Sequence, residues 1–223
     1  MATAQVSQTI NVTTAGTLST LASAYLSTVT NITVTGNIDA RDVLTMRDQM
    51  PNLAILDISG VSIVAYTGTA GTGGTTLISY SANEMPIFSF YNTFVGGKIS
   101  QKIITLPTTL ISIEYGAFMG CRGLTGSLTI PNSVTTLGRD AFNGCSNISS
   151  LTLGNSVIII GDHAFYNCSG LKLIYCLNET PPTLGSYAFI GDVSVTNVLV
   201  PTIASVIVYK AAISYFQRNK INI

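Results

Sequence analysis

Short segments in which apolar and polar residues alternate recur along this chain at a nearly constant spacing. Three of them, Ile104-Thr-Leu106, Leu128-Thr-Ile130 and Leu151-Thr-Leu153, begin 24 and 23 residues apart. Alternation over so short a span is typical of a strand that buries one face. Pro107 and Pro131 directly follow the first two segments, where a proline would end a strand. The pattern therefore predicts a repeated unit of strand and turn.

The repeat is clearest where the segment from Leu128 to Cys145 aligns residue for residue with the segment from Leu151 to Cys168. A fixed internal period of this length is typical of a solenoid, whose repeats bury their apolar faces only against one another. Equivalent strands then pair in parallel, about 4.8 Å apart. Gly138 and Gly161 are expected where the backbone turns sharply. An Ala-Phe pair marks each repeat, and its phenylalanines should stack as a buried row: Phe118, Phe142, Phe165 and Phe189.

The same period extends to the amino terminus in degraded form. Counting back from Leu106 in steps of 24 reaches strand-like segments around Ile58, Val34 and Ile10, although position 82 falls in an irregular region. A glycine-rich stretch from Thr67 to Thr75 interrupts one repeat and is expected to be a surface loop, because no Gly-Lys-Ser/Thr follows that would indicate a phosphate site. About nine coils result.

Helical spacing of apolar residues appears in three places. It runs from Asp39 to Met50, with Asp39 as the cap, from Leu18 to Leu26, and from Ser205 to Phe216, where a helix would close the end of the core. We therefore predict one α/β domain over residues 1–223, a right-handed solenoid with a parallel sheet on one face. Residues 1–102 form degenerate repeats with a loop insertion near 66–80, residues 103–200 form regular repeats, and residues 201–223 form a helical C-terminal cap.

Composition and charge narrow the classes of function. Of the 223 residues, 47% are hydrophobic and 9% are charged, and ten basic residues balance ten acidic ones. Scattered cations and zero net charge argue against a nucleic-acid partner. The sequence has no run of about 18 apolar residues, so it predicts no membrane-spanning helix. No secretion signal is visible, and richness in Thr, Ser, Asn and Gly favours an extracellular protein whose signal has been removed.

Candidate chemistry is sparse. Cys121, Cys145 and Cys168 recur at one repeat position, and together with Cys176 they are expected to be buried thiols outside any disulfide. The spacing lacks the paired cysteines of a zinc site. His163 is expected at a solvated turn, without a nucleophile placed near it by spacing, and Asp140 and Asp162 should stack one coil apart. We predict no catalytic residues, no cofactor and no metal.

The motif Leu-Thr-Ile-Pro-Asn-Ser-Val, followed by Leu-Gly, Ala-Phe and Gly-Cys, resembles the BspA-like (Treponema pallidum-type) leucine-rich repeats. The resemblance is specific over residues 103–216 and weaker before Ile58. Gly154 and Leu177 stand where the family has proline, and Asp192 replaces the last cysteine. The resemblance implies a secreted or surface-attached, non-enzymatic protein of the Bacteroidetes type that binds other proteins, with host matrix or another bacterium's surface as the partner.

A candidate binding surface follows from the outward residue of each strand. These residues change from hydroxyl side chains to an aromatic and an apolar one toward the carboxyl end, and threonine by itself also simply favours strands. The alternative interpretation is a recognition surface on the concave sheet, centred on Tyr175 with Thr129, Thr152 and Leu199 around it. The full outward row is Thr33, Asp57, Thr105, Thr129, Thr152, Tyr175 and Leu199.

Three classes of function remain: a binding module for proteins, a structural spacer of a larger surface protein, and an enzyme. The absence of any catalytic constellation favours the binding module, acting as a monomer, with a glycan-binding module as a further alternative.

Overall fold

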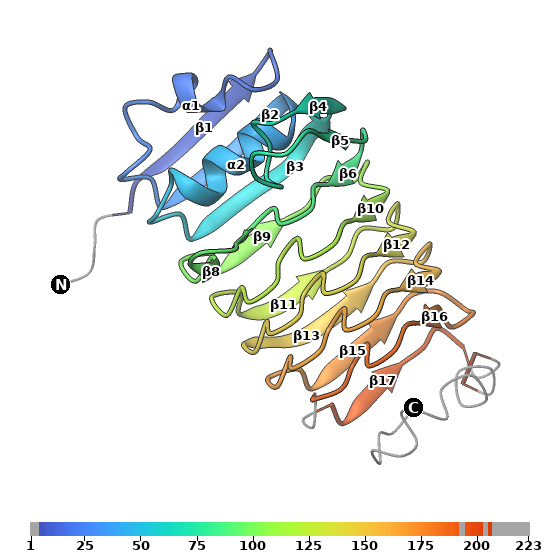
Figure 1. Cartoon of the computed structure of the whole chain (residues 1–223). Coiled ribbons are helices and arrows are strands. Elements are labelled where there is room, and N and C mark those ends of the chain that lie inside the picture. Colours follow the sequence, from blue (N-terminus) through green and yellow to red (C-terminus); the bar gives the residue numbers. More distant parts are fainter. Residues whose placement is uncertain (1–4, 192–194, 203–204, 207–223) are drawn as a thin grey trace.

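The computed structural model describes residues 5–191, 195–202 and 205–206, and these form an elongated stack of coils (Figure 1). One side of the stack is a row of parallel strands, ordered as two four-stranded sheets. Each strand pairs with its equivalent one coil away, for example Ile10 with Val34 and Leu151 with Ile174. The predicted parallel sheet is therefore confirmed. The row contains β1 (Ser7–Val12), β2 (Asn31–Ile38), β3 (Ile55–Ile63), β9 (Ile103–Thr105), β11 (Gly126–Thr129), β13 (Ile148–Leu153), β15 (Leu173–Cys176) and β17 (Asn197–Leu199).

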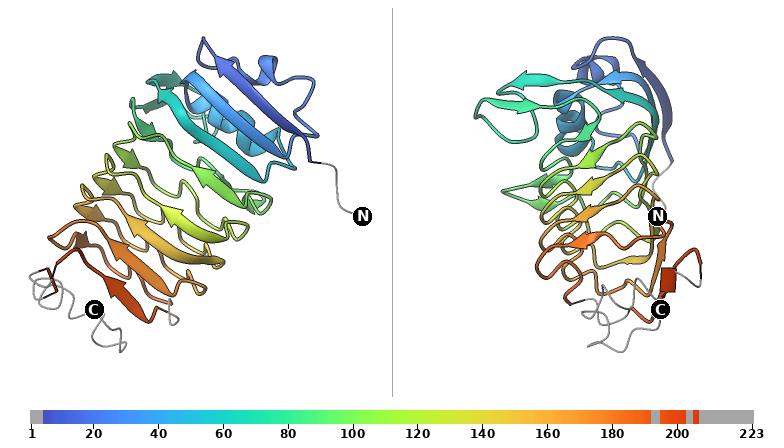
Figure 2. Two further views of the ribbon diagram at one scale, coloured as in Figure 1. Left: turned by 180° about the vertical axis from the view of Figure 1, so that it is seen from behind. Right: turned by 90° about the vertical axis from the view of Figure 1, so that its right-hand side faces the viewer.

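A second ribbon of two-residue strands lines another side of the stack (Figure 2). Its parallel pairs keep the same period, with Ile113 opposite Leu137 and Leu137 opposite Ile160. Each coil thus consists of a main strand, a turn, a short second strand and an irregular return. The ribbon contains β6 (Glu84–Met85), β10 (Ser112–Ile113), β12 (Thr136–Leu137), β14 (Ile159–Ile160) and β16 (Thr183–Leu184).

The main row has eight strands in the described residues, whereas the sequence predicted about nine coils. The difference arises because β3 pairs directly with β9, with Ile55 opposite Ile103, across two periods of sequence. The intervening chain leaves the main row, contributes β6 to the second ribbon and forms two hairpins. These are β4 (Tyr66–Gly68) with β5 (Ile78–Tyr80), which encloses the glycine-rich loop, and β7 (Tyr91–Asn92) with β8 (Gly96–Gly97).

Helices occur near the amino terminus of the described chain, as predicted. Helix α2 (Ala40–Asp48) begins with the expected cap, because the Asp39 side chain accepts from the backbone of Arg41 and the Asp42 side chain accepts from the backbone N–H of Asp39. Helix α1 (Leu18–Leu21) is shorter than the segment predicted from Leu18 to Leu26. The predicted C-terminal cap lies almost wholly outside the described residues.

The core contains a continuous ladder of phenylalanine rings. The predicted rings stack at centroid distances of 5.0 to 5.3 Å, and Phe90 extends the ladder by stacking on Phe118 at 5.2 Å. All four cysteines are buried thiols, as predicted. The Cys145 Sγ donates to the Phe118 carbonyl at 3.1 Å and the Cys168 Sγ to that of Phe142 at 3.2 Å, so the thiols tie each coil to an earlier one.

The recurrence of glycine at Gly138 and Gly161 has a different cause from the predicted sharp turn. Neither residue has a positive φ, but a Cβ atom at Gly138 would lie 2.9 Å from the carbonyl carbon of Glu114 in the preceding coil. Close packing of coils therefore requires glycine there. The left-handed positions lie two residues further on, at Asp140 and His163, both with φ of 56°.

Candidate functional site

The predicted binding residues lie side by side on the outer face of the main row. Strand pairing places Thr129 opposite Thr152, Thr152 opposite Tyr175, and Tyr175 opposite Leu199. Tyr175 is 39% exposed and Leu199 is 47% exposed, while the alternate residues Leu151 and Ile174 are buried in the core. Period-two alternation therefore brings the four predicted residues into one line across four strands.

This line continues toward the amino terminus. Thr33, Asp57 and Thr105 face outward in register, and Thr9 stands at the start of the line opposite Thr33. Thr9 was absent from the sequence-based row, although the segment around Ile10 gave the signal for it. The structure thus presents a ladder of mostly hydroxyl groups, spaced by the strand separation, that becomes aromatic and apolar at the carboxyl end.

The face around Tyr175 is electrically neutral. The four strands β11, β13, β15 and β17 contain no Asp, Glu, Lys or Arg. The neighbouring line of side chains adds hydroxyl groups, and Ser127 Oγ and Ser150 Oγ lie 2.7 Å apart in a hydrogen bond. A neutral surface with one large amphipathic ring can bind a partner by ring contact and hydrogen bonding rather than by charge.

The side chains considered for catalysis have structural contacts. His163, expected to be solvated, is half-buried against the rings of Tyr166 and Tyr187, each at a centroid distance of 5.4 Å. Its Nδ1 is buried and has no hydrogen-bond partner among the described residues. Asp162 Oδ1 accepts from the Ser186 backbone at 2.6 Å. These groups stabilise turns between coils rather than form an acid–base pair.

Asp140 and the buried thiols also have structural contacts. Asp140 accepts from Asn143 Nδ2 at 2.7 Å and from Arg139 Nε at 3.1 Å. Burial raises the pKa of the Cys121 thiol to about 12 and raises that of Cys145 well above its ordinary value. Such thiols stay protonated at neutral pH and are poor nucleophiles.

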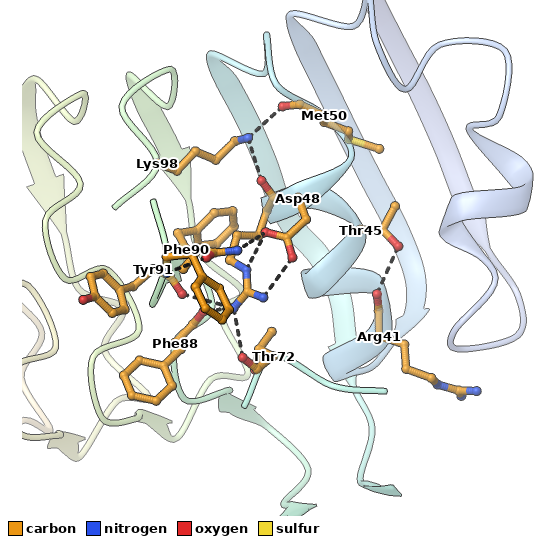
Figure 3. A network of polar contacts seen from close by, with 12 residues as sticks. Arg41, Thr45, Asp48, Met50, Thr72, Phe88, Phe90, Tyr91 and Lys98 are labelled. Carbon is orange, nitrogen blue, oxygen red and sulfur yellow. Dashed lines mark hydrogen bonds and ion pairs between the residues drawn. The ribbon is translucent and has the colours of Figure 1, made fainter. Parts of the chain in front are cut away.

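A polar junction that the sequence did not predict joins helix α2 to the hairpin region (Figure 3). The Arg47 guanidinium pairs with Asp48 at 2.8 Å and donates to the carbonyls of Thr72, Phe88 and Tyr91 at 2.9 to 3.1 Å. The Lys98 ammonium donates to the carbonyls of Arg47 at 3.1 Å and Met50 at 2.7 Å, at the carboxyl end of the helix.

Burial of Lys98 lowers its pKa from 10.5 to about 8. A hollow of about 260 Å³ lies beside it, lined by residues of α2 and of the β7–β8 hairpin. Because all of these donors face backbone carbonyls or Asp48, the junction fixes the position of the hairpin. These backbone contacts span 25 to 51 residues of irregular sequence, and they left no periodic signal that could have indicated the junction.

No helix in the described part of the chain is long and apolar enough to cross a membrane. The described residues also contain no group of three or more His, Cys, Asp or Glu side chains that could hold a metal ion.

Comparisons with known proteins agree with the repeat. The model of the BspA type leucine rich repeat region matches residues 88–220 in six copies. Among solved structures, the chain is similar to a leucine-rich repeat protein of T. pallidum, with 26% identity and a TM-score of 0.46 over 52% of this chain and 62% of that one. It is also similar to the pneumococcal vaccine antigen PcpA, with 17% identity and a TM-score of 0.48 over 83% of this chain and 57% of that one. No curated protein sequence matches it.

The chain spans about three fifths of the length of either solved structure. The family model, in contrast, covers more than half of this chain, from residue 88 to residue 220. The repeats contribute to the ladder of phenylalanine rings, to the buried thiols and to the main row described above. The chain therefore belongs to the BspA-type leucine-rich repeat family.

Proposed function

We propose that this chain is a non-enzymatic, secreted or cell-surface repeat protein that binds a protein partner through the outer face of β11, β13, β15 and β17. The observation that carries the proposal is the line of Thr129, Thr152, Tyr175 and Leu199 on a neutral sheet. An ordered sheet holds these side chains in place before binding, which lowers the entropic cost of association. Family membership supports a binding role, since solenoids gather one residue per coil into an extended surface.

The proposed partner is a host matrix protein or a surface protein of another bacterium, bound by a monomer of this chain. A screen of the purified protein against matrix proteins and a glycan array would identify the partner and separate protein binding from glycan binding. A structural spacer would bind neither and would tolerate changes on this face.

Once a partner is known, Tyr175→Ala should weaken binding at least about tenfold, because a central aromatic ring is a typical hot spot. Tyr25→Ala is the matched control, since Tyr25 is 38% exposed and lies near the other end of the stack. Both variants should melt close to the wild-type temperature. Equal affinity of the Tyr175→Ala variant and the wild type would place the binding site elsewhere.

A further inference from the structure

The β7–β8 hairpin holds two large apolar side chains out in water. Phe94 is 95% exposed and Val95 is 83% exposed at the tip of the hairpin, and Ile99 just beyond it is 69% exposed. These three residues, which we call the prong, are among the most exposed large apolar side chains in the described chain. Such exposure is unfavourable in water and marks an interaction site when it is clustered.

The hairpin that carries the prong is rigidly held at its base. The Asn92 side chain donates to Asp48 at 3.2 Å and accepts from the Phe94 backbone at 2.9 Å. Lys98 anchors the outgoing strand to helix α2. On the other side, Gly97 lies so close to the backbone of Gly120 that no Cβ atom would fit between them. The prong is therefore a fixed projection and not a collapsed loop.

Further apolar groups lie beside the prong at the amino ends of the main strands. Ile103 is 50% exposed and pairs with Ile55, which is 36% exposed. Figure 1 shows β8 at the amino end of β9, on the same side as the loops that enter the following main strands. We call this side of the stack the amino edge; its loops are residues 98–102, 121–125, 145–149 and 168–172.

The amino edge has a single sign of charge. Three of its four loops contain cations, none of the four contains Asp or Glu, and Lys102, Arg122 and Lys172 are exposed there. Asp48, the carboxylate that the hairpin contacts through Asn92, is paired with Arg47. In the regular repeats, the described carboxylates lie in the other turns of the coil, at Glu114, Asp140, Asp162 and Glu179. In the regular repeats, the described carboxylates therefore lie away from the amino edge, although one cation, Arg139, lies beside Asp140.

We propose that the amino edge docks on the surface of an anionic phospholipid bilayer, with Phe94 and Val95 inserted at the boundary of headgroups and acyl chains. Lys102, Arg122 and Lys172 span about 15 Å along the stack, since coils are spaced by the strand separation. A broad anionic surface can contact all three cations while the prong enters it, which combines the apolar and electrostatic contributions of interfacial binding. This is attachment to one leaflet and is independent of the function proposed for the Tyr175 face.

Co-sedimentation with vesicles tests the proposal. The wild-type protein should bind vesicles of phosphatidylcholine and phosphatidylserine, bind vesicles of phosphatidylcholine alone more weakly, and lose binding as salt is raised. The double substitution Phe94→Ser and Val95→Ser should reduce partitioning at least about tenfold, because it removes the inserted apolar surface. The double substitution Lys102→Glu and Arg122→Glu should also reduce partitioning into the vesicles, by about fivefold or more for each cation.

Matched variants keep the test specific. Ile158→Ser changes a side chain that is 55% exposed on another side of the stack, and Arg139→Glu reverses a cation outside the amino edge. Both should bind vesicles like the wild type, as should Tyr175→Ala. Absence of vesicle binding, or equal binding by the prong variant, would overturn the proposal. A concentration-dependent dimer that the prong variant abolishes would overturn it in favour of a second copy as the occupant.

Discussion

At the scale of the residue, the same side chain has opposite roles in this protein. Phe142 lies in the middle of the ring ladder, with Phe118 at 5.0 Å and Phe165 at 5.3 Å, and it is fully buried. Phe94 is almost wholly exposed at a hairpin tip. Burial, rather than residue type, therefore decides how much each ring contributes to the stability of the fold.

We expect Phe142→Ala to lower the free energy of unfolding by about 3–5 kcal/mol, because the cavity would lie between two rings that cannot close on it. Phe94→Ala should change that free energy by less than about 0.5 kcal/mol. Chemical denaturation of the two variants makes the comparison. A small effect at Phe142 would mean that the ladder relaxes around the gap.

The ring ladder could be predicted because phenylalanine recurs at a constant period, and the outward row because each strand alternates apolar and outward residues at that same period. The left-handed backbone at Asp140 and His163 could not, because Asp and His adopt it more often than most residues but far less often than glycine, so neither residue indicates it by itself. Glycine did reveal crowded positions, at Gly138 and Gly161, but the cause was the neighbouring coil rather than the local turn.

At the scale of the element, helix α2 depends on a lysine from a distant hairpin. Lys98 donates to two carbonyls at the carboxyl end of the helix, where a cation is also favoured by the helix dipole. Helix α2 itself could be predicted from the helical spacing of its apolar residues and from Asp39 as its cap. The contact with Lys98 could not be predicted, because Lys98 lies 51 positions along the chain from Arg47 and 48 positions from Met50, in irregular sequence.

The lowered pKa of Lys98 predicts a pH dependence of stability. Between about pH 8, its pKa in the folded chain, and 10.5, the ordinary value, the unfolded chain binds more protons than the folded one. The free energy of unfolding should therefore gain a contribution from Lys98 that rises with pH across this range.

Denaturation of the wild type and Lys98→Met over this pH range isolates that contribution, since other titrating groups are common to both proteins. The wild type should gain stability relative to Lys98→Met as pH rises. Lys102→Met, which removes an exposed lysine, should follow the wild type. Parallel curves for the wild type and Lys98→Met would show that Lys98 titrates normally in the folded chain.

At the scale of the whole molecule, the sequence predicted the solenoid and its parallel sheet, and about nine coils where the described residues form eight strands of the main row. Counting periods assumed that every 24 residues return to the main row. The chain from Val64 to Lys102 instead contributes only β6 and Phe90 to the stack and extends outward as two hairpins. The pairing of Ile55 with Ile103 closes the main sheet across it. Length alone cannot distinguish a complete coil from an excursion of the same size.

This pairing determines how the protein would respond to mechanical tension. Strands cross the long axis of the stack, so a force applied between its two ends would separate neighbouring strands one pair at a time. Each released coil of about 24 residues would lengthen the chain by about 80 Å, at about 3.5 Å per residue. Separation of β3 from β9 would release twice as many residues, so single-molecule pulling should record one extension of about 160 Å among shorter equal ones. A single extension of the entire chain would contradict unfolding by coils.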